Sequence, residues 1–278
     1  MGIRKRILPR GWYPASAHDC SQEIGEFLAG FTPPTGTWVG GVAPHAGWAF
    51  SGRAAARVIS TLAGAGTPDR VVIYGGHLPG DRHPVIYTDD GWETPLGVLD
   101  LDAQTAKDLV EQGRAVRAGA GFNDNTVEVM LPFVKHFFPR VPVLAVHAPS
   151  SAKAIDLGSA LDEVLGQKRL SAIFVGSADL THYGPNYGFV PKGTGPAAVQ
   201  WVKDENDKAL IDKALAMDAQ GVLEDARNRH NSCSPGPIAA VIASVDRHGV
   251  ENGRLLEYYT SYDVIPGSSF VGYAAIVY

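Results

Sequence analysis

The sequence predicts an α/β protein: a single three-layer α/β/α domain over residues 1–278, with a largely parallel or mixed central sheet. Short apolar, β-branched runs bounded by glycine or proline alternate with longer segments in which apolar residues recur every three or four positions. No internal repeat, low-complexity tract or linker divides the sequence. A chain of 278 residues is also long enough to bury a large core.

The predicted elements follow from these two patterns. Apolar runs without alternation are typical of strands that are covered on both faces. They predict strands at residues 38–43, 70–75, 141–146, 171–176 and 270–278. Helical spacing predicts helices at residues 52–63, 101–111, 126–138, 152–165, 204–216 and 237–247. Residues 185–196 are rich in proline and glycine, which predicts a surface loop of a length that often carries function.

Charge and composition exclude several classes of partner. The formal net charge is −5 and the isoelectric point is near 6.0, so we expect no nucleic-acid partner. No run of about 18 apolar residues occurs, so we expect no membrane span. With two cysteines, Cys20 and Cys233, and no signal-peptide pattern at the start, a reducing cytoplasmic location is expected. No sequence pattern indicates an oligomeric state.

Four histidines follow predicted strands. The carboxyl ends of strands in an open α/β sheet border the ligand crevice. His45, His77 and His182 stand beside glycines, where the backbone can approach a ligand closely, although any one of them alone would more often be a structural hydrogen-bonding residue. We expect His147 to be structural. Surface positions are expected for the remaining histidines: His18, His83, His136, His230 and His248.

Cys233 directly precedes the predicted helix at 237–247. A helix N-terminus favours the thiolate, which is a nucleophile or a metal ligand. The alternative is a small buried apolar residue. Two chemistries fit the pattern. One is a mononuclear metal on His45, His77 and Cys233 with open positions for a substrate. The other is a hydrolase with Cys233 as nucleophile, His182 as base and Asp179 as its orienting carboxylate. Standard nucleotide-binding motifs are absent from the sequence.

Six motifs then occur in one order along the chain. They are Pro44-His45-Ala46-Gly47 with Ser51-Gly52, Trp92-Glu93-Thr94-Pro95-Leu96-Gly97, Glu128 with Leu131-Pro132-Phe133, Ser177-Ala178-Asp179-Leu180-Thr181-His182-Tyr183-Gly184, Cys233-Ser234-Pro235-Gly236-Pro237-Ile238, and Tyr273-Ala274-Ala275. From about residue 7 to the C-terminus, the chain therefore resembles the Memo-like family, which includes the "AmmeMemoRadiSam system protein B" proteins.

This family is similar in fold to the class III extradiol dioxygenases, non-haem iron enzymes that open catechol rings with a metal held by two His and a Glu. The resemblance implies that His45 and His77 are metal ligands and that Cys233 replaces the Glu. It also implies that His182 is the acid/base residue, with Asp179 as its partner. Asn125 stands where the family usually has a pocket histidine, which affects the family's substrate contacts.

The expected function is that of a metal-dependent, dioxygenase-like oxidoreductase acting on a small aromatic or related substrate. Fe2+ is the expected cofactor, with Zn2+ or copper as alternatives. The main alternative function is non-catalytic: binding of a phosphopeptide, another acidic peptide or a small ligand, or metal handling. Aromatic walls of the substrate site are expected from Trp48, Tyr183 and Tyr262. Contacts to the histidine ligands are expected from Tyr262, Ser261 and Glu128.

Overall fold

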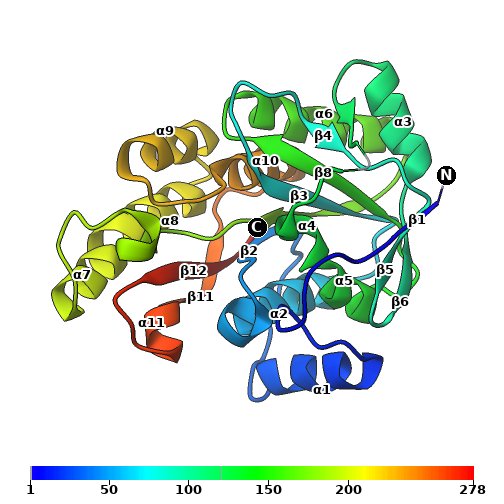
Figure 1. Ribbon diagram of the computed structural model, residues 1–278. Helices are drawn as coiled ribbons and strands as arrows, with labels where there is room; N and C mark the ends of the chain where they lie inside the picture. Colours follow the sequence, from blue (N-terminus) through cyan, green and yellow to red (C-terminus); the bar gives the residue numbers. More distant parts are fainter. Residues whose placement is uncertain (1, 120) are drawn as a thin grey trace.

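The computed structural model describes residues 2–119 and 121–278 and has helices on both faces of a mixed sheet (Figure 1). The strands of this sheet lie in the order β10-β12-β2-β9-β3-β8-β4-β7, and β11 also pairs with β12. Its four central strands, β2, β9, β3 and β8, are parallel to one another, whereas β12 and β4 run antiparallel to them on either side. The predicted α/β/α architecture is confirmed.

The five predicted strands correspond closely to β2, β3, β8, β9 and β12. The strands of the main sheet are β2 Gly40–Ala43, β3 Arg70–Leu78, β4 Val85–Ile86, β7 Val116–Arg117, β8 Val143–Pro149, β9 Ala172–Ser177, β10 His182–Tyr183, β11 Arg254–Thr260 and β12 Phe270–Val277. A second, small sheet contains β1 Ile3–Arg4, β5 Gly91–Thr94 and β6 Gly97–Asp100. The sequence patterns did not predict the small sheet or the strands β4, β7, β10 and β11, because these strands are either only a few residues long or partly exposed and lack a long continuous apolar run.

Two groups of helices cover the main sheet. One face is covered by α1 Ala17–Phe27, α2 Trp48–Gly64, α4 Asn125–Glu128 and α5 Leu131–Phe137. The other face is covered by α3 Ala103–Glu111, α6 Lys153–Gln167, α8 Asp207–Leu215, α9 Ala219–Arg229 and α10 Pro235–Val245. The short helices α7 Pro196–Trp201 and α11 Ser261–Val264 lie near β10 and the start of β12.

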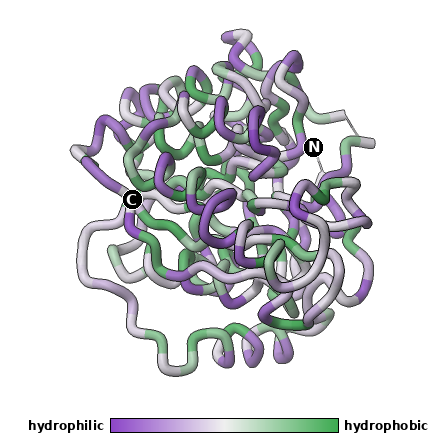
Figure 2. Tube along the Cα trace, turned by 90° about the vertical axis from the view of Figure 1, so that its left-hand side faces the viewer, coloured by the Kyte–Doolittle hydropathy of each residue, from purple (hydrophilic) through white to green (hydrophobic). Residues whose placement is uncertain are grey.

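The core has two main halves, one on each face of the sheet. Along β3, Val71 and Ile73 belong to the half under α2, whereas Val72 and Tyr74 belong to the half under α10. This alternation is the two-residue period of a strand buried on both faces. Figure 2 shows apolar segments running through the interior and polar residues recurring on the outer helices.

Three predicted segments need correction. The helix predicted at 126–138 is two helices, because Pro132 has no backbone N–H to continue a helix and opens α5 instead. The helix predicted at 204–216 is π-helical at its start: the π-helix Val202–Asn206 continues into α8, which begins at Asp207. The predicted loop at 185–196 includes one 3-10 turn, Pro185–Tyr187. Among the described residues, no helix is both long and apolar enough to cross a membrane.

Candidate metal centre

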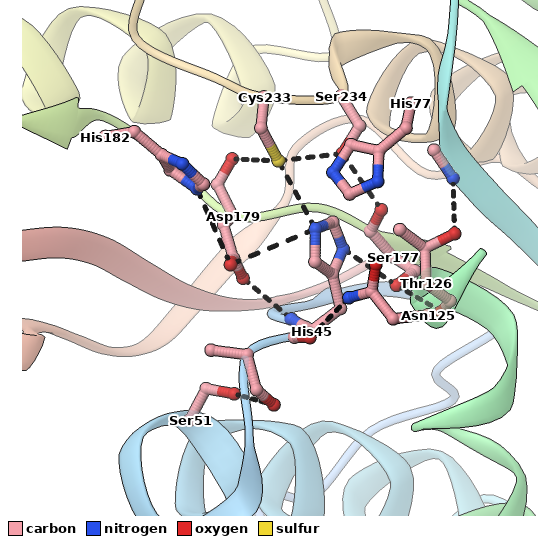
Figure 3. Close-up of polar contacts among 12 residues, drawn as sticks. His45, Ser51, His77, Asn125, Thr126, Ser177, Asp179, His182, Cys233 and Ser234 are labelled. Carbon is pink, nitrogen blue, oxygen red and sulfur yellow. Dashed lines mark hydrogen bonds and ion pairs between the residues drawn. The ribbon is translucent and has the colours of Figure 1, made fainter. Parts of the chain in front are cut away.

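The candidate site lies at the carboxyl ends of the parallel strands. His45 follows β2, His77 lies near the end of β3, and Asp179 and His182 follow β9. Cys233 comes from the segment before α10, and its sulfur lies between these imidazoles in Figure 3. Residues far apart in the sequence meet here because neighbouring parallel strands end at the same edge of a sheet.

Glycines allow α10 to begin close to this edge. A β-carbon at Gly76 would collide with the Ser234 side chain, and one at Gly236 would collide with the Pro149 carbonyl. The missing side chains thus let the backbone before α10 approach β3 and β8. Cys233 is thereby held beside the histidines.

Three side chains form a group that could hold a metal ion. One ligand atom each from His45, His77 and Cys233 lies within 4.8 Å of the other two. The Cys233 Sγ is 3.3 Å from His45 Nε2, and the two imidazole centroids are 5.0 Å apart. Two nitrogens and a thiolate are ligands that suit zinc, copper and iron.

Hydrogen bonding fixes which nitrogen of His45 is free. The Ser177 hydroxyl donates to the Thr126 carbonyl at 2.6 Å, so its oxygen accepts from His45 Nδ1 at 3.0 Å. The proton of the neutral ring therefore lies on Nδ1. The lone pair on Nε2 faces Cys233, as a metal ligand requires.

His77 is oriented by backbone conformation and by a carboxylate. Its φ of 59° is in the left-handed region, uncommon for a residue with a β-carbon, at an irregularity in the pairing of β3 with β8. Its Nδ1 donates to Asp124 Oδ2 at 2.9 Å, and Asp124 is itself held by the Thr126 N–H at 2.9 Å. A carboxylate on one ring nitrogen leaves Nε2 available to a metal.

Asp179 and His182 lie beside the three candidate ligands. Asp179 Oδ1 accepts from the His45 backbone N–H at 2.7 Å. Its Oδ2 lies 3.8 Å from His182 Nε2 and 3.9 Å from His45 Nε2. One buried carboxylate thus faces two imidazoles.

The cluster favours the charged forms of its members. Burial opposes the thiolate, but His45, His182 and His77 lower the pKa of Cys233 well below its usual value. Burial also opposes the imidazolium of His77 and His182. Asp124 and Cys233 nevertheless raise the pKa of His77 to about 10, and Asp179 and Cys233 raise that of His182 to about 10. Without a metal, these interactions favour a thiolate at Cys233 and imidazolium groups at His77 and His182.

Two cavities reach this cluster. The larger, about 530 Å³, is lined by Trp12, His45, Ala46, Gly47, Phe50, His77, Asn125, Asp179, His182, Tyr187, Ser261, Ile265, Pro266, Gly267, Ser269, Val271 and Tyr273. The smaller, about 470 Å³, reaches Cys233 and Ser232 from the side of α9. His182 and Tyr187 line both cavities, and their rings are 4.8 Å apart.

Comparisons with known proteins identify the family of the chain. The family described as "Memo-like protein" matches residues 8–277. The chain belongs to the Memo-like family. A "MEMO1 family protein" of Methanopyrus kandleri is 35% identical over 252 residues, covering 87% of this chain and 83% of that protein. Another, from Pyrococcus abyssi, is 33% identical over 251 residues and covers 85% of each chain. A solved structure of an uncharacterized Escherichia coli protein is 16% identical, with a TM-score of 0.47, and covers 80% of this chain and 91% of that one.

The three aromatic residues expected to line the substrate site of this Memo-like protein do not line the larger cavity. Trp48 is buried in the core, stacks on Phe133 with centroids 4.0 Å apart, and donates to the Val129 carbonyl. Tyr183 is fully buried, stacks on Phe270 and donates to the Gly193 carbonyl. Tyr262 packs on the other side of this small apolar cluster. Large aromatic side chains near a site are drawn into the core because they bury so much surface.

The residues that contact the histidine ligands also differ from those expected. Glu128 contacts neither ligand: its carboxylate accepts from the backbone N–H groups of Ile7 and Leu8 and from the Tyr13 hydroxyl. It thereby anchors the N-terminal segment that carries Trp12 to the cavity. Ser261 lines the cavity, but its hydroxyl accepts from Val271 N–H.

Sequence reasoning missed the side chains that do hold the ligands, Ser177 and Asp124. Ser177 opens a quoted motif at the end of β9, so its place beside the site could have been found from the sequence. Asp124 is 47 residues from His77, and no local pattern points to that contact. Asn125, which replaces the family's usual histidine, lines the cavity and donates to the His45 carbonyl at 3.1 Å. The structural role expected for His147 is confirmed: it is fully buried between the Gly76 carbonyl and the Tyr87 hydroxyl.

Proposed function

We propose that this protein holds a single non-haem metal ion, Fe2+ in the first place, on His45 Nε2, His77 Nε2 and Cys233 Sγ. We further propose that it is an oxidoreductase of the extradiol dioxygenase type, acting on a small aromatic or related molecule. One observation carries the proposal: three ligand atoms converge within 4.8 Å, and Nδ1 of each imidazole is engaged by Ser177 or Asp124.

The donor set supports a catalytic rather than a structural ion. Three protein ligands leave positions open, whereas structural sites use four. When bound, an iron ion would offer those positions to a substrate and to dioxygen. Zn2+ and copper are the alternatives, because thiolate is a soft ligand. The free thiols of Cys20 and Cys233 suit the reducing cytoplasm, where we place the protein.

The larger cavity supports an aromatic substrate. Trp12, Phe50, Tyr187 and Tyr273 supply aromatic surface next to His45 and His77. A phenol bound there would place its hydroxyl near His182. A metal ion on Cys233 would neutralise the thiolate that helps to keep His182 protonated, so His182 could then accept the hydroxyl proton as a neutral imidazole. The Asp179 carboxylate, 3.8 Å from Nε2, would stabilise the resulting imidazolium.

The same lining disfavours a phosphopeptide as the main ligand. Of the described residues that border this cavity, none is a lysine or an arginine. Phosphate groups are usually bound by such side chains. Imidazolium groups are the cations that remain, and metal binding by His45 and His77 would remove two of them. Acidic-peptide binding is therefore the second candidate, limited to the metal-free protein.

The experiment is anaerobic loading with Fe2+, followed by metal analysis and measurement of O2 uptake with a panel of catechols. We expect one iron per chain, lost in His45→Ala and retained in the surface control His18→Ala, and O2 uptake that His182→Gln reduces. Iron no higher in the wild type than in His45→Ala, together with no uptake, would reject the proposal. Calorimetry with a phosphotyrosine peptide on metal-free protein tests the second candidate. If Cys233 is labelled by iodoacetamide and the protein hydrolyses esters at a rate that metal removal does not change, the thiol hydrolase is indicated instead.

A further inference from the structure

A buried polar network lies behind the candidate site, on the side of α8. Its members are Thr181, Asn206, Asp207 and Asn231, each with at most 1% of its surface exposed. Thr181 directly precedes His182, and Asn231 lies two residues before Cys233. The network therefore joins the two chain segments that carry the proposed proton-transfer residue and the proposed sulfur ligand.

Asp207 is the centre of the network. Its Oδ1 accepts from the Thr181 backbone N–H at 3.0 Å and from the Thr181 hydroxyl, and its Oδ2 accepts from the Tyr258 hydroxyl at 2.7 Å. A β-carbon at Gly272 would collide with Oδ2, so β12 is shaped to admit the carboxylate. Burial raises the pKa of Asp207 to about 6, so at neutral pH it is a carboxylate that only accepts hydrogen bonds.

The π-helix Val202–Asn206 brings a second side chain into the network. Asn206, its last residue, donates from Nδ2 to the Thr181 hydroxyl oxygen at 2.9 Å, next to the contact made by Asp207. A π-helical turn inside a helix is rare and is frequent at functional sites. Here it allows two consecutive residues, Asn206 and Asp207, to bind the same threonine.

The network continues from Asn206 to the cysteine. The Asn206 carbonyl accepts from Asn231 Nδ2 at 2.8 Å. Ser232 and Cys233, the two residues after Asn231, contact the segment that carries His182. The Ser232 hydroxyl and the Cys233 N–H both donate to the Asp179 carbonyl, at 2.9 and 3.3 Å. The contacts close a ring through Asp179, Thr181, Asn206 and Cys233.

We propose that Asp207 is a positioning residue of this site, which acts through Thr181 on His182 and through Asn206 and Asn231 on Cys233. The inference rests on the proposed function for what those two residues do. The Thr181 hydroxyl donates to Asp207 and accepts from Asn206, and Asn231 donates to the Asn206 carbonyl, so hydrogen bonds link all four side chains to the segments of His182 and Cys233. Stability alone does not explain four buried polar side chains at this place, because well-packed apolar residues would stabilise the fold equally well.

The test compares Asp207→Ala with Asp102→Ala. Asp102 is a matched control, because it is also a buried aspartate that binds a threonine hydroxyl, a backbone N–H and a third donor, Arg70, but it contacts α3. Co2+ is the probe: its dissociation constant and its thiolate-to-cobalt absorption band report the position of Cys233. In parallel, the alkylation rate of Cys233 is measured in metal-free protein.

We expect Asp207→Ala to weaken Co2+ binding by about 10- to 100-fold and to diminish the thiolate band, as removal of a residue behind a metal ligand does. Asp207→Asn should restore most of the affinity, because its carbonyl can accept from Thr181 and its amide can donate to Tyr258. Asp102→Ala should change thermal stability and leave both cobalt readouts unchanged. If Asp207→Ala does not fold, Thr181→Val replaces it in the same comparison.

Equal cobalt affinities for Asp207→Ala and the wild type, or equal losses in the Asp207 and Asp102 variants, would overturn the inference. Failure of the wild type to bind Co2+ would reject the proposed function and leave alkylation as the readout. In that case, a changed Cys233 alkylation rate in Asp207→Ala but not in Asp102→Ala supports the positioning role, and an unchanged rate rejects it.

Discussion

The two cysteines of this chain are both enclosed by protein, yet their surroundings shift their acidity in opposite directions. Cys20 is fully buried in α1 among apolar core residues, with its thiol donating to the Pro14 carbonyl at 3.2 Å. Burial, helped by the charge of Glu23, raises its pKa to about 12. No cation in its surroundings is strong enough to reverse that effect.

Burial also opposes the thiolate of Cys233, which is partly buried, but three imidazoles outweigh that effect and lower its pKa. The helix α10, which begins two residues later, adds the positive end of its dipole. Burial by itself therefore does not decide the acidity of a thiol. The partners gathered at the carboxyl ends of the strands turn one of two cysteines into a thiolate.

The largest expected difference is in reactivity. In metal-free protein at pH 7, iodoacetamide should label Cys233 more than about 1,000-fold faster than Cys20, because the thiolate is the reactive form. The rate at Cys233 should stay nearly constant as the pH falls from 8 to 6, whereas an ordinary thiol loses about tenfold per pH unit. Mass spectrometry of tryptic peptides measures both rates. Equal labelling would show that the two thiols do not differ in reactivity.

Metal affinity should separate the two cysteines next. Cys233→Ala should weaken Co2+ or Fe2+ binding by at least about 100-fold. Removing a residue that only contacts a ligand costs up to about 100-fold, and Cys233 is proposed to be a ligand itself. Cys20→Ala is the matched control and should leave the dissociation constant unchanged. Equilibrium titration with a competing chelator measures it, and equal affinity in both variants would remove Cys233 from the site.

The neighbours of the ligands should matter almost as much as the ligands. Asp124→Ala frees His77 Nδ1 and should weaken metal binding by about 10- to 100-fold. The control is Asp19→Ala, which removes an exposed carboxylate on α1 next to Cys20 and should leave metal affinity unchanged. The same chelator titration compares the two, and a normal affinity for Asp124→Ala would show that His77 needs no fixed orientation.

A smaller effect is expected on the pKa of His182. The Asp179 carboxylate and the Cys233 thiolate both stabilise its imidazolium, which places its pKa at about 10. In metal-free Cys233→Ala, the pKa should fall below that value, because one of the two anions is gone, and the stability that depends on the imidazolium should be lost at a lower pH. NMR titration of the ring protons measures the shift. A pKa unchanged from the wild type would assign the whole effect to Asp179.

The smallest effect concerns Cys20 itself. Cys20→Ala removes a buried sulfur without removing a charge and should lower the free energy of unfolding by about 1 kcal/mol. Chemical denaturation measures it in metal-free protein. A loss several times larger would mean that Cys20 has a role beyond packing.

The layered α/β/α architecture, the central strands and the candidate ligands could all be predicted from the sequence. Strand and helix periods are local properties, and both are visible in a single sequence. Parallel strands that end at one edge place His45, His77 and His182 together, and the helix predicted at 237–247, which the structure begins at Pro235, follows Cys233 closely. These predictions needed only neighbouring residues and the rule that parallel strands end at one edge of the sheet.

Only the tertiary structure decided which side chains complete the site. Trp48, Tyr183 and Tyr262 are near the site in sequence but turn into apolar clusters, whereas Trp12 reaches the cavity because Glu128 binds the chain before it. The partners of the histidines and the network around Asp207 depend on contacts between segments 26 to 132 residues apart. Hydrogen-bond geometry of this kind is set by how layers pack, and no local period of the sequence encodes it.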